Sequence, residues 1–323
     1  MDNYIVTGVS GFIASKVAEQ LLEEGHSVIG IDNMNEYYDI SIKNYRLEYL
    51  KKYDYFSFYK IDIENKDAFD DAFSQARVKC VFNLAARAGV RYSMENPYVY
   101  LSTNTLGVLN TLELMRKHDV EKLVLASTSS LYAGQPMPFN ENLSVNTPIS
   151  PYAASKKAAE MFSHSYHHLY DLDISIVRYF TVFGPAGRPD MCIFRFIKWI
   201  DEGVAIELFG DGNQSRDFTY VDDVARGTIL AQKKLGYKIL NLGGGMIPVS
   251  LNEIIKYIEN KLDKKAVINH KPFHKADISE TSASIGKAKE LLDWEPEMEF
   301  WDGFDRTIEW YIQNRNWLKE VKL

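Results

Sequence analysis

Cysteine is scarce in this chain of 323 residues, which contains only Cys80 and Cys192. Two isolated cysteines supply neither a disulfide framework nor the paired spacing of a thiolate metal site. Cys80 stands in an apolar run and is interpreted as a core residue. The seven histidines also form no metal-ligand pattern. We therefore expect no bound metal.

Long apolar runs and an excess of basic residues are missing as well. No stretch approaches the roughly 20 apolar residues that span a bilayer. The N-terminus shows neither a charged leader nor a cleavage signal. The chain has 37 basic and 44 acidic residues, a formal net charge of −7, and no basic cluster. We therefore expect no membrane and no nucleic acid among its partners, and a cytoplasmic location.

What the chain does contain is a regular alternation of short apolar runs with amphipathic stretches. Continuous Val/Ile/Leu runs separated by helices are typical of a parallel sheet that is covered on both faces. We therefore expect an α/β fold with a doubly wound, Rossmann-like parallel sheet. The expected strands are 4–7, 27–31, 56–61, 78–84, 122–126 and 174–179, and the expected helices are 13–24, 67–76, 98–117 and 152–169.

The pattern changes at a cluster of glycine and proline over residues 184–189. Such a cluster breaks regular structure. The remaining chain mixes short strands with helices expected at 251–261, 285–292 and 303–313. We therefore predict a cofactor domain over residues 1–183, with segments returning to it near 217–246. Residues 184–323 would form a smaller mixed α/β domain that binds the substrate.

A glycine-rich loop, Gly8-x-x-Gly11-x-x-Ala14, joins the first expected strand to the first helix. Gly8 permits the tight turn, Gly11 lets the backbone approach a pyrophosphate, and Ala14 allows close helix packing. Asp32 ends the second strand, 18 residues after Ala14. A carboxylate there accepts hydrogen bonds from the ribose hydroxyls of NAD and repels the 2′-phosphate of NADP. The alternatives are a plain strand–helix turn and a helix N-cap at Asp32.

Tyr152 and Lys156 lie four residues apart at the start of an expected helix, so they share one face. A lysine ammonium there stabilises a phenolate, and we expect it to lower the tyrosine pKa toward the range useful for general acid–base catalysis. Thr128 follows an apolar strand and is placed to bridge a substrate hydroxyl to Tyr152. A Y-x-x-x-K spacing alone is common, and Thr128 also suits a polar strand end.

These motifs together resemble the extended short-chain dehydrogenase/reductase family and, within it, the nucleotide-sugar epimerases. The resemblance covers nearly the whole length and also rests on the strings at 178–180, 216–218 and 221–224 and on Ala276-Asp277. Rarer strings at 35–39, 88–93 and 184–191 are similar to those of UDP-glucuronate 4-epimerases. Two departures are mild, since Ala14 replaces the usual third glycine and Ala133 a glycine after Tyr132.

The resemblance implies bound NAD, a UDP-sugar substrate and a homodimer formed through the helices 98–117 and 152–169, although these helices fit a core role equally well. It implies cofactor contacts at Gly8, Gly11, Phe12, Ile13, Asp32, Asp62, Ile63, Leu84, Ala85, Ala86, Asn104, Tyr152, Lys156 and Tyr179. It implies substrate contacts at Arg91, Thr128, Ser129, Ser130, Tyr152, Thr181, Arg188, Leu208, Phe209, Arg216 and Asp277, with Phe194 as a further cover for uracil. The catalytic residues would be Tyr152, Lys156 and Thr128.

Ser129 and Ser130 narrow the reaction that follows oxidation of the sugar at C4. Related dehydratases carry an Asp-Glu pair here, and related decarboxylases carry a glutamate at the position of Ser130. Serines cannot replace these acids, whereas epimerisation needs neither. A 4-keto uronate tends to lose CO2, so an epimerase has to hold its carboxylate. Arg188, with Thr181 and Ser129, is the first candidate for this role and Arg91 the second, while a loop-stabilising arginine is the alternative for Arg188.

Reversible C4 epimerisation of UDP-glucuronate is therefore the function that the sequence favours. Three alternatives stay open. The first is a 4-epimerase of a neutral UDP-sugar such as UDP-glucose or UDP-N-acetylglucosamine. The second is a UDP-glucuronate decarboxylase or an oxidoreductase with net turnover of NAD. The third is a catalytically inactive NAD-binding regulator.

Overall fold

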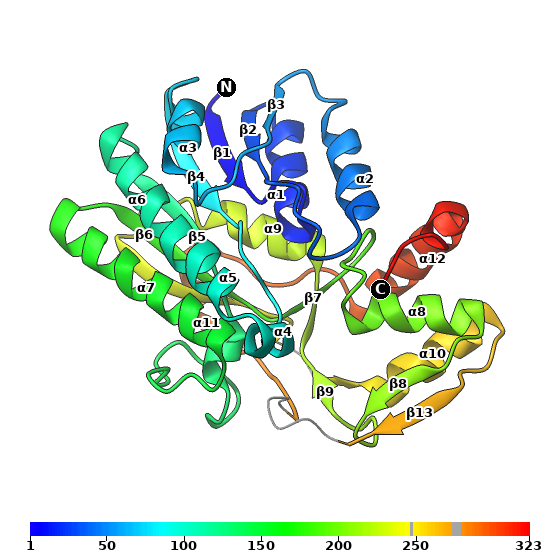
Figure 1. The fold of residues 1–323 in the computed structure, drawn as a ribbon. Helices are drawn as coiled ribbons and strands as arrows, with labels where there is room; N and C mark the ends of the chain where they lie inside the picture. Colours follow the sequence, from blue (N-terminus) through cyan, green and yellow to red (C-terminus); the bar gives the residue numbers. More distant parts are fainter. Residues whose placement is uncertain (246–247, 273–278) are drawn as a thin grey trace.

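A parallel sheet forms the centre of the molecule, which we describe from a computed structural model over residues 1–245, 248–272 and 279–323 (Figure 1). Within these ranges seven strands follow the order β11-β6-β5-β4-β1-β2-β3, with parallel neighbours. They are β1 (Asn3–Thr7), β2 (Ser27–Ile31), β3 (Phe56–Tyr59), β4 (Val78–Asn83), β5 (Lys122–Thr128), β6 (Asp173–Tyr179) and β11 (Tyr237–Leu242). The expected doubly wound α/β fold is confirmed.

Alternate residues along the strands of the sheet belong to two separate hydrophobic cores, one on each face. In β1, Tyr4 and Val6 belong to one core and Ile5 to the other, as the two-residue repeat of a strand requires. The first core is closed by α1 (Phe12–Glu23), α9 (Val221–Leu230) and α11 (Gly286–Leu292). The second is closed by α3 (Lys66–Phe73), α6 (Gly107–Lys117) and α7 (Pro151–Tyr170), and Figure 1 shows α6 and α7 side by side.

A third core lies in a smaller mixed α/β lobe, on the right of Figure 1. It is built from α8 (Cys192–Glu202), α10 (Leu251–Leu262) and α12 (Phe300–Leu318) and from short strand pairs. Ile42 of α2 (Ile40–Leu50) joins this core, so α2 packs against both lobes. The short strands are β7 (Thr181–Phe183), β8 (Ile206–Phe209), β9 (Ser215–Arg216), β10 (Phe218–Tyr220), β12 (Val249–Ser250) and β13 (Ile268–Lys271).

The helix expected over residues 98–117 is interrupted, which corrects the sequence prediction. It consists of α5 (Tyr98–Leu101), a π-helical segment over Ser102–Leu106, and α6. Asn104, inside the π segment, donates one hydrogen bond to the carbonyl of Arg87 (2.9 Å) and another to the hydroxyl of Ser155 (2.9 Å). These long-range bonds favour the wider turn because it carries Asn104 toward both partners.

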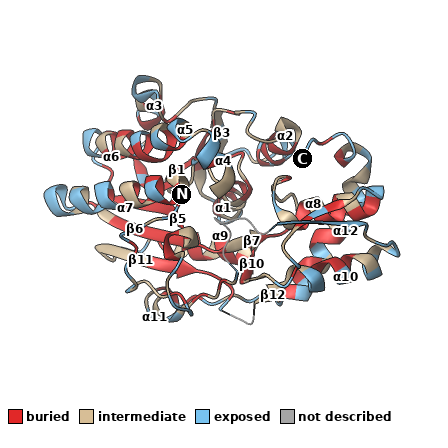
Figure 2. Cartoon of the chain, turned by 60° about the horizontal axis from the view of Figure 1, so that its bottom comes forward, coloured by how far each residue is buried: buried red, intermediate tan, exposed pale blue. Residues whose placement is uncertain are grey.

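Several elements lie outside the periodicity seen in the sequence: α2, α4 (Val90–Glu95), α8, α9 and a 3₁₀ turn over Ser129–Tyr132. α2 is hard to recognise because it buries two basic residues, Lys43 and Arg46, beside its apolar ones. In the part of the chain described here, no helix is long and apolar enough to cross a bilayer. Figure 2 shows the inner strands of the central sheet, such as β5 and β6, as buried along most of their length.

Candidate active site

A cleft of about 470 Å³ runs along the carboxyl ends of the central strands and reaches the loop over residues 184–191. It lies where β1 and β4 meet, the point at which the order of strand addition reverses and where ligands bind in such folds. The predicted residues that line it are Gly8, Gly11, Phe12, Ile13, Asp32, Asp62, Ile63, Leu84, Ala85, Ala86, Thr128, Ser129, Ser130, Tyr152, Lys156, Tyr179, Thr181, Arg188 and Arg216.

The glycine loop at one end of the cleft has the shape needed to hold a pyrophosphate. Gly8 has φ +69°, and a Cβ there would lie 2.8 Å from Cα of Ala85. A Cβ on Gly11 would lie 2.8 Å from the carbonyl oxygen of Gly8. Gly11 is the N-cap of α1, and no side chain caps that helix. The free N–H groups and positive dipole end of α1 are therefore available to a phosphate.

Asp32 directly follows β2 inside the cleft, with only 7% of its surface exposed. Its carboxylate accepts N–H bonds from Ser10 (3.1 Å) and Met34 (2.8 Å), one on each oxygen, so further lone pairs remain for two ribose hydroxyls. Asp39, rather than Asp32, caps the following helix α2. The N-cap alternative for Asp32 is therefore wrong, and the residues at this end fit a dinucleotide.

The Tyr152–Lys156 pair stands in the first turns of α7, which begins with a Ser150 cap and proline at the first helical position. Tyr152 lines the cleft together with Thr128, the last residue of β5, and the Thr128 hydroxyl acts on the Tyr152 phenol in the direction that lowers its pKa. Lys156 is 3% exposed and lines the same cleft. The structure thus brings all three predicted catalytic side chains to one wall of the cleft.

The pKa of Tyr152 differs from the sequence expectation. Burial raises the pKa of Tyr152, while the Thr128 hydroxyl and the charge of Arg188 act in the lowering direction. We expected Lys156 to provide that lowering. Burial itself brings the pKa of Lys156 down to about 8, against the raising influence of Glu160. The lowered phenol pKa predicted from spacing alone is therefore wrong, because desolvation of the tyrosine dominates.

The groups expected around the sugar meet at the other end of the cleft. Ser129 and Ser130 open the 3₁₀ turn after β5, and Ser130 donates its N–H to the capping hydroxyl of Thr128 (3.1 Å). Thr181 begins β7, and Arg188 extends from the glycine- and proline-rich loop. Arg188 donates two hydrogen bonds to Asp190, from Nε (3.0 Å) and Nη2 (2.5 Å). Burial opposes its charge, but Asp190 raises the pKa of Arg188 above its usual range.

The residues expected to bind the UDP group do not all lie in the main cleft. The guanidinium of Arg91 lies 3.9 Å from the ring centre of Phe209, so two predicted contacts meet outside the main cleft. Leu208 is 1% exposed in the core of the smaller lobe, so its side chain is not available to cover uracil. Arg216 lines the cleft and donates to the carbonyl of Ser215 (2.8 Å). Asp277 lies outside the described residues.

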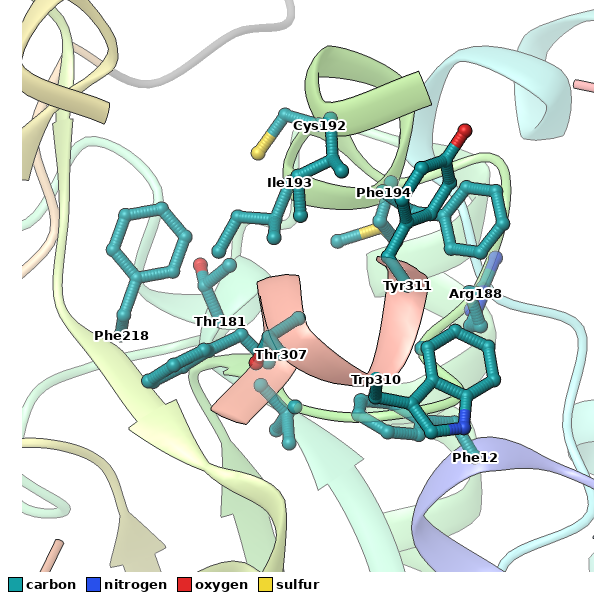
Figure 3. Close-up of a pocket in the computed structure, with 16 residues that line it drawn as sticks. Phe12, Thr181, Arg188, Cys192, Ile193, Phe194, Phe218, Thr307, Trp310 and Tyr311 are labelled. Carbon is teal, nitrogen blue, oxygen red and sulfur yellow. The ribbon is translucent and has the colours of Figure 1, made fainter. Parts of the chain in front are cut away.

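Phe194, the further candidate for uracil, lines a separate apolar cavity of about 20 Å³ (Figure 3). Trp310 and Tyr311 of α12 face this cavity, and Arg188 and Phe12 border both it and the main cleft. Its volume is close to that of one water molecule, so it holds no nucleotide base.

Asn104 does not line the cleft, although we predicted a cofactor contact there. Its amide accepts the Arg87 N–H (2.8 Å) and donates to the Arg87 carbonyl and to Ser155, so it fixes the chain that follows β4. Sequence reasoning also missed several side chains that line the cleft, among them Tyr37, Tyr38, Lys43 and Arg87. The available signals were the 35–39 string and the position of Arg87 directly after Leu84-Ala85-Ala86.

Among the described residues, no group of three or more His, Cys, Asp or Glu side chains is arranged to hold a metal ion.

Comparison with known proteins places these features in a wider group. Residues 4–243 match the model of the NAD dependent epimerase/dehydratase family. The chain is 57% identical over 323 residues to a UDP-glucuronate 4-epimerase of Thermodesulfobacterium geofontis, with 100% of both chains covered. The predicted resemblance to nucleotide-sugar epimerases is confirmed.

Solved structures of similar proteins share this fold. The UDP-glucuronic acid 4-epimerase of Bacillus cereus, in complex with UDP-glucuronic acid and NAD, superposes with a TM-score of 0.91 at 33% identity, covering 97% of this chain and 99% of that one. The UDP-glucose 4-epimerase of Thermotoga maritima with UDP-glucose gives 0.85 at 32% identity, with the same coverage of 97% and 99%. Because both sugars occur among these structures, the fold alone does not select the sugar.

Proposed function

Because this chain belongs to the NAD dependent epimerase/dehydratase family, we propose that it catalyses the reversible C4 epimerisation of UDP-glucuronate to UDP-galacturonate. The observation that carries the proposal is the combination of Arg188 with Ser129 and Ser130 in the cleft of Thr128, Tyr152 and Lys156. The full-length identity of 57% to a UDP-glucuronate 4-epimerase supports it. The enzyme is an NAD-dependent isomerase.

Tyr152 is proposed as the group that takes the proton of the sugar C4 hydroxyl, directly or through Thr128. Lys156, buried on the same helix face, supplies positive charge that stabilises the phenolate as it forms. A bound NAD would supply the hydride acceptor for oxidation at C4 and the hydride donor for reduction of the ketone from its opposite face. Tyr152 then gives its proton back, so the chain ends each cycle in its starting protonation state.

Ser129 and Ser130 stand where related dehydratases and decarboxylases carry acidic residues, so at these positions the 4-keto sugar meets no side chain that could promote dehydration or decarboxylation. A hydroxyl has no carboxylate base to remove the C5 proton and no acid to protonate a departing group. We propose that Arg188 binds the uronate carboxylate, and that Ser129 and Thr181 hydrogen-bond to it. Burial raises the pKa of the Tyr152 phenol, and the charge of Arg188 acts on it in the lowering direction, which is consistent with both side chains serving one sugar.

The remaining residues of the cleft are proposed to hold the two nucleotides. Cofactor contacts would come from the glycine loop, Asp32, the residues after β3 and β4, and Tyr179. We propose residues 1–183, with the returning segments near 217–246, as the cofactor domain and residues 184–323 as the substrate domain. Arg216, Phe209 and Arg91 are proposed contacts of the UDP group, and so is Asp277.

We also propose a homodimer. Apolar side chains are exposed along α5, the π segment and α7, which lie on the same side of the sheet. Exposure is 60% for Leu101, 56% for Met161 and 62% for Leu169. Helices that pair across a two-fold axis bury such a surface. A cytoplasmic location stays a prediction from the sequence.

The test is incubation of the purified protein with UDP-glucuronate, with products identified by NMR and CO2 measured in parallel. UDP-galacturonate without CO2 and without net absorbance change at the NADH band supports the proposal. UDP-xylose or a 4-keto pentose would identify a decarboxylase instead. Turnover of UDP-glucose or UDP-N-acetylglucosamine, with none of UDP-glucuronate, would identify a neutral-sugar epimerase.

A further inference from the structure

Arg188 is held by a neighbour in its own loop and by two rings from a distant segment of the chain. Asp190, two residues away, accepts two hydrogen bonds from one edge of its guanidinium. The guanidinium carbon also lies 5.7 Å from the ring centre of Tyr37 and 5.8 Å from that of Tyr38. These tyrosines come from the loop between β2 and α2. An arginine held at one edge and over two rings has its plane and direction fixed.

Tyr37 is held in position by its contacts with α4 and with the chain just before it. Its ring packs 5.3 Å from that of Tyr92 in α4. Gly89 has φ +111°, and a Cβ there would lie 2.5 Å from the Tyr37 hydroxyl. The sequence therefore leaves room for Tyr37 at the point where the chain passes it. Burial raises the pKa of Tyr37, so its phenol stays neutral beside Arg188.

Tyr38 is held in position by a hydrogen bond from Arg46. Arg46 is 4% exposed and donates from Nη1 to the Tyr38 hydroxyl (2.8 Å). The same guanidinium donates to the carbonyl of Ala186 from Nε (3.0 Å) and Nη2 (2.7 Å), and to that of Gly187 (3.2 Å). It also donates to the carbonyl of Ser10 in the glycine loop (3.0 Å). One buried side chain thus ties α2 to the glycine loop and to the loop that carries Arg188.

We propose that Tyr37, Tyr38 and Arg46 are positioning residues that set the direction of Arg188 and thereby decide whether the 4-keto uronate keeps its carboxylate. This inference rests on the proposed role of Arg188 as the carboxylate partner. Loss of CO2 breaks the bond between C5 and the carboxyl carbon. Its electron pair enters the C4 ketone as an enolate, and a proton from water then gives the 4-keto pentose.

That loss is fastest when the breaking bond is parallel to the π orbitals of the ketone. A carboxylate pinned by an immobile guanidinium stays out of that alignment. A guanidinium that swings lets the carboxylate rotate into it. The rings beneath Arg188 therefore act on the partition between epimer and CO2 and on affinity for the uronate, and not on the first oxidation step.

The experiment compares five variants of the holoenzyme with the wild type. Tyr37→Leu and Tyr38→Leu remove a ring, whereas Tyr37→Phe and Tyr38→Phe keep the ring and remove only the hydroxyl. Two quantities are measured: the ratio of CO2 to UDP-galacturonate, and the Kd of UDP-glucuronate relative to that of UDP-glucose by calorimetry. UDP-glucose lacks the carboxylate and serves as the internal reference. Arg188→Ala gives the largest change that loss of this arginine can produce.

Each leucine variant is expected to weaken UDP-glucuronate binding about 3- to 10-fold, the range of a partly desolvated cation–π contact. Binding of UDP-glucose should stay within about twofold, and the share of CO2 should rise toward that of Arg188→Ala. Tyr37→Phe should stay close to the wild type. Should the leucine variants fail to fold, Arg46→Lys tests the same support, because a lysine cannot reach all three carbonyls.

Leucine variants with an unchanged Kd ratio and unchanged CO2 release, beside an altered Arg188→Ala, overturn the inference. Failure of the proposed function is a different result, since wild type would then give no UDP-galacturonate. In that case crystal structures of the leucine variants decide the matter. An Arg188 guanidinium still seated on Asp190 in its original direction contradicts the positioning role, and a displaced guanidinium supports it.

Discussion

Glu160 and Arg178 form a buried ion pair directly behind the predicted catalytic lysine. Glu160, one turn after Lys156 on α7, accepts hydrogen bonds from Arg178 Nε (2.9 Å) and Nη2 (2.7 Å), and both side chains are 1% exposed. Ser127 of β5 donates to the same carboxylate (2.7 Å). The pair therefore fixes the catalytic helix against the two strands, β5 and β6, that it covers.

Glu160→Gln should lower the free energy of unfolding by about 3–5 kcal/mol, because it leaves the buried Arg178 charge without its partner. Chemical denaturation of the purified protein measures this. The matched control is Lys157→Met, since Lys157 lies 3.8 Å from Glu160 but is 21% exposed. That change should cost under about 1 kcal/mol. Equal effects of the two substitutions would show that the pair contributes no more than a surface contact.

Tyr152→Phe should reduce turnover by about 10²- to 10⁴-fold, the usual contribution of a general acid–base group. NAD binding should be retained, because the ring and its packing against Tyr100 (5.9 Å between ring centres) remain. Product formation by NMR and NAD content by absorbance measure the two effects. Tyr98→Phe, at a position 80% exposed, is the control and should leave turnover unchanged. Turnover by Tyr152→Phe at the wild-type rate would assign the proton transfer to another group.

Asp32→Ser should weaken NAD binding about 10- to 100-fold, the value of hydrogen bonds to a charged group. The same change should improve NADP binding relative to NAD, because Lys43 Nζ stands 4.0 Å from the Asp32 carboxylate and would then face a 2′-phosphate. Burial lowers the pKa of Lys43 to about 8 although the Asp32 charge acts in the raising direction, so in the variant the 2′-phosphate would have to replace Asp32 as the negative charge that keeps Lys43 protonated. Titration with both cofactors tests this, and an unaltered NAD/NADP ratio would refute the role of Asp32.

Asp217 should make stability depend on pH between about 4 and 6. Burial raises the pKa of Asp217 to about 6, against the lowering effect of N–H bonds from Ala283 (2.7 Å) and Gly245 (3.2 Å). The folded state then holds a proton that the unfolded state has lost, so this contribution to stability is present below pH 4 and is lost as the pH rises to 6.

Asp217→Asn removes that titration. The difference in unfolding free energy between the variant and the wild type should therefore shift in favour of the variant as the pH rises from 4 to 6, by at most about 3 kcal/mol, and then level off. Denaturation of both proteins at several pH values measures this difference. All other titrating groups are shared by the two proteins, so their contributions cancel. A difference that is independent of pH would mean that Asp217 titrates normally.

The double variant Leu101→Asp/Met161→Asp should convert a dimer into monomers, because each subunit would bring charge into an apolar interface. Analytical ultracentrifugation gives the mass in solution. Val267→Asp, at an exposed position in the other lobe, is the control and should leave the mass unchanged. A wild-type protein that sediments as a monomer would contradict the proposed dimer outright.

The sheet and the core of the site could be predicted because their signals are local. Strands read as apolar runs, and the motif spacings of Gly8 with Gly11 and of Tyr152 with Lys156 fall within a few residues. The fold then brings these motifs to one edge of the sheet, since carboxyl ends of parallel strands meet there.

The missed features depend on contacts between distant segments. Arg46 is buried only because three carbonyl groups and Tyr38 surround it, so its helix carries no clear apolar stripe. The π segment forms because Asn104 reaches Arg87 and Ser155, which no local pattern reveals. The pKa of Tyr152 was misjudged for the same reason: spacing gives the nearby charge, but burial comes only with the complete fold.

The position of β11 at one edge of the central sheet has a consequence for the nascent chain. β11 pairs with β6 along its whole length, from Tyr237 opposite Ile174 to Leu242 opposite Tyr179. Until residue 242 has left the ribosome, β6 offers an open row of backbone donors and acceptors to any other strand. At about 5–20 residues per second that interval lasts on the order of several seconds. A fragment ending at residue 183 keeps this edge open permanently and should aggregate.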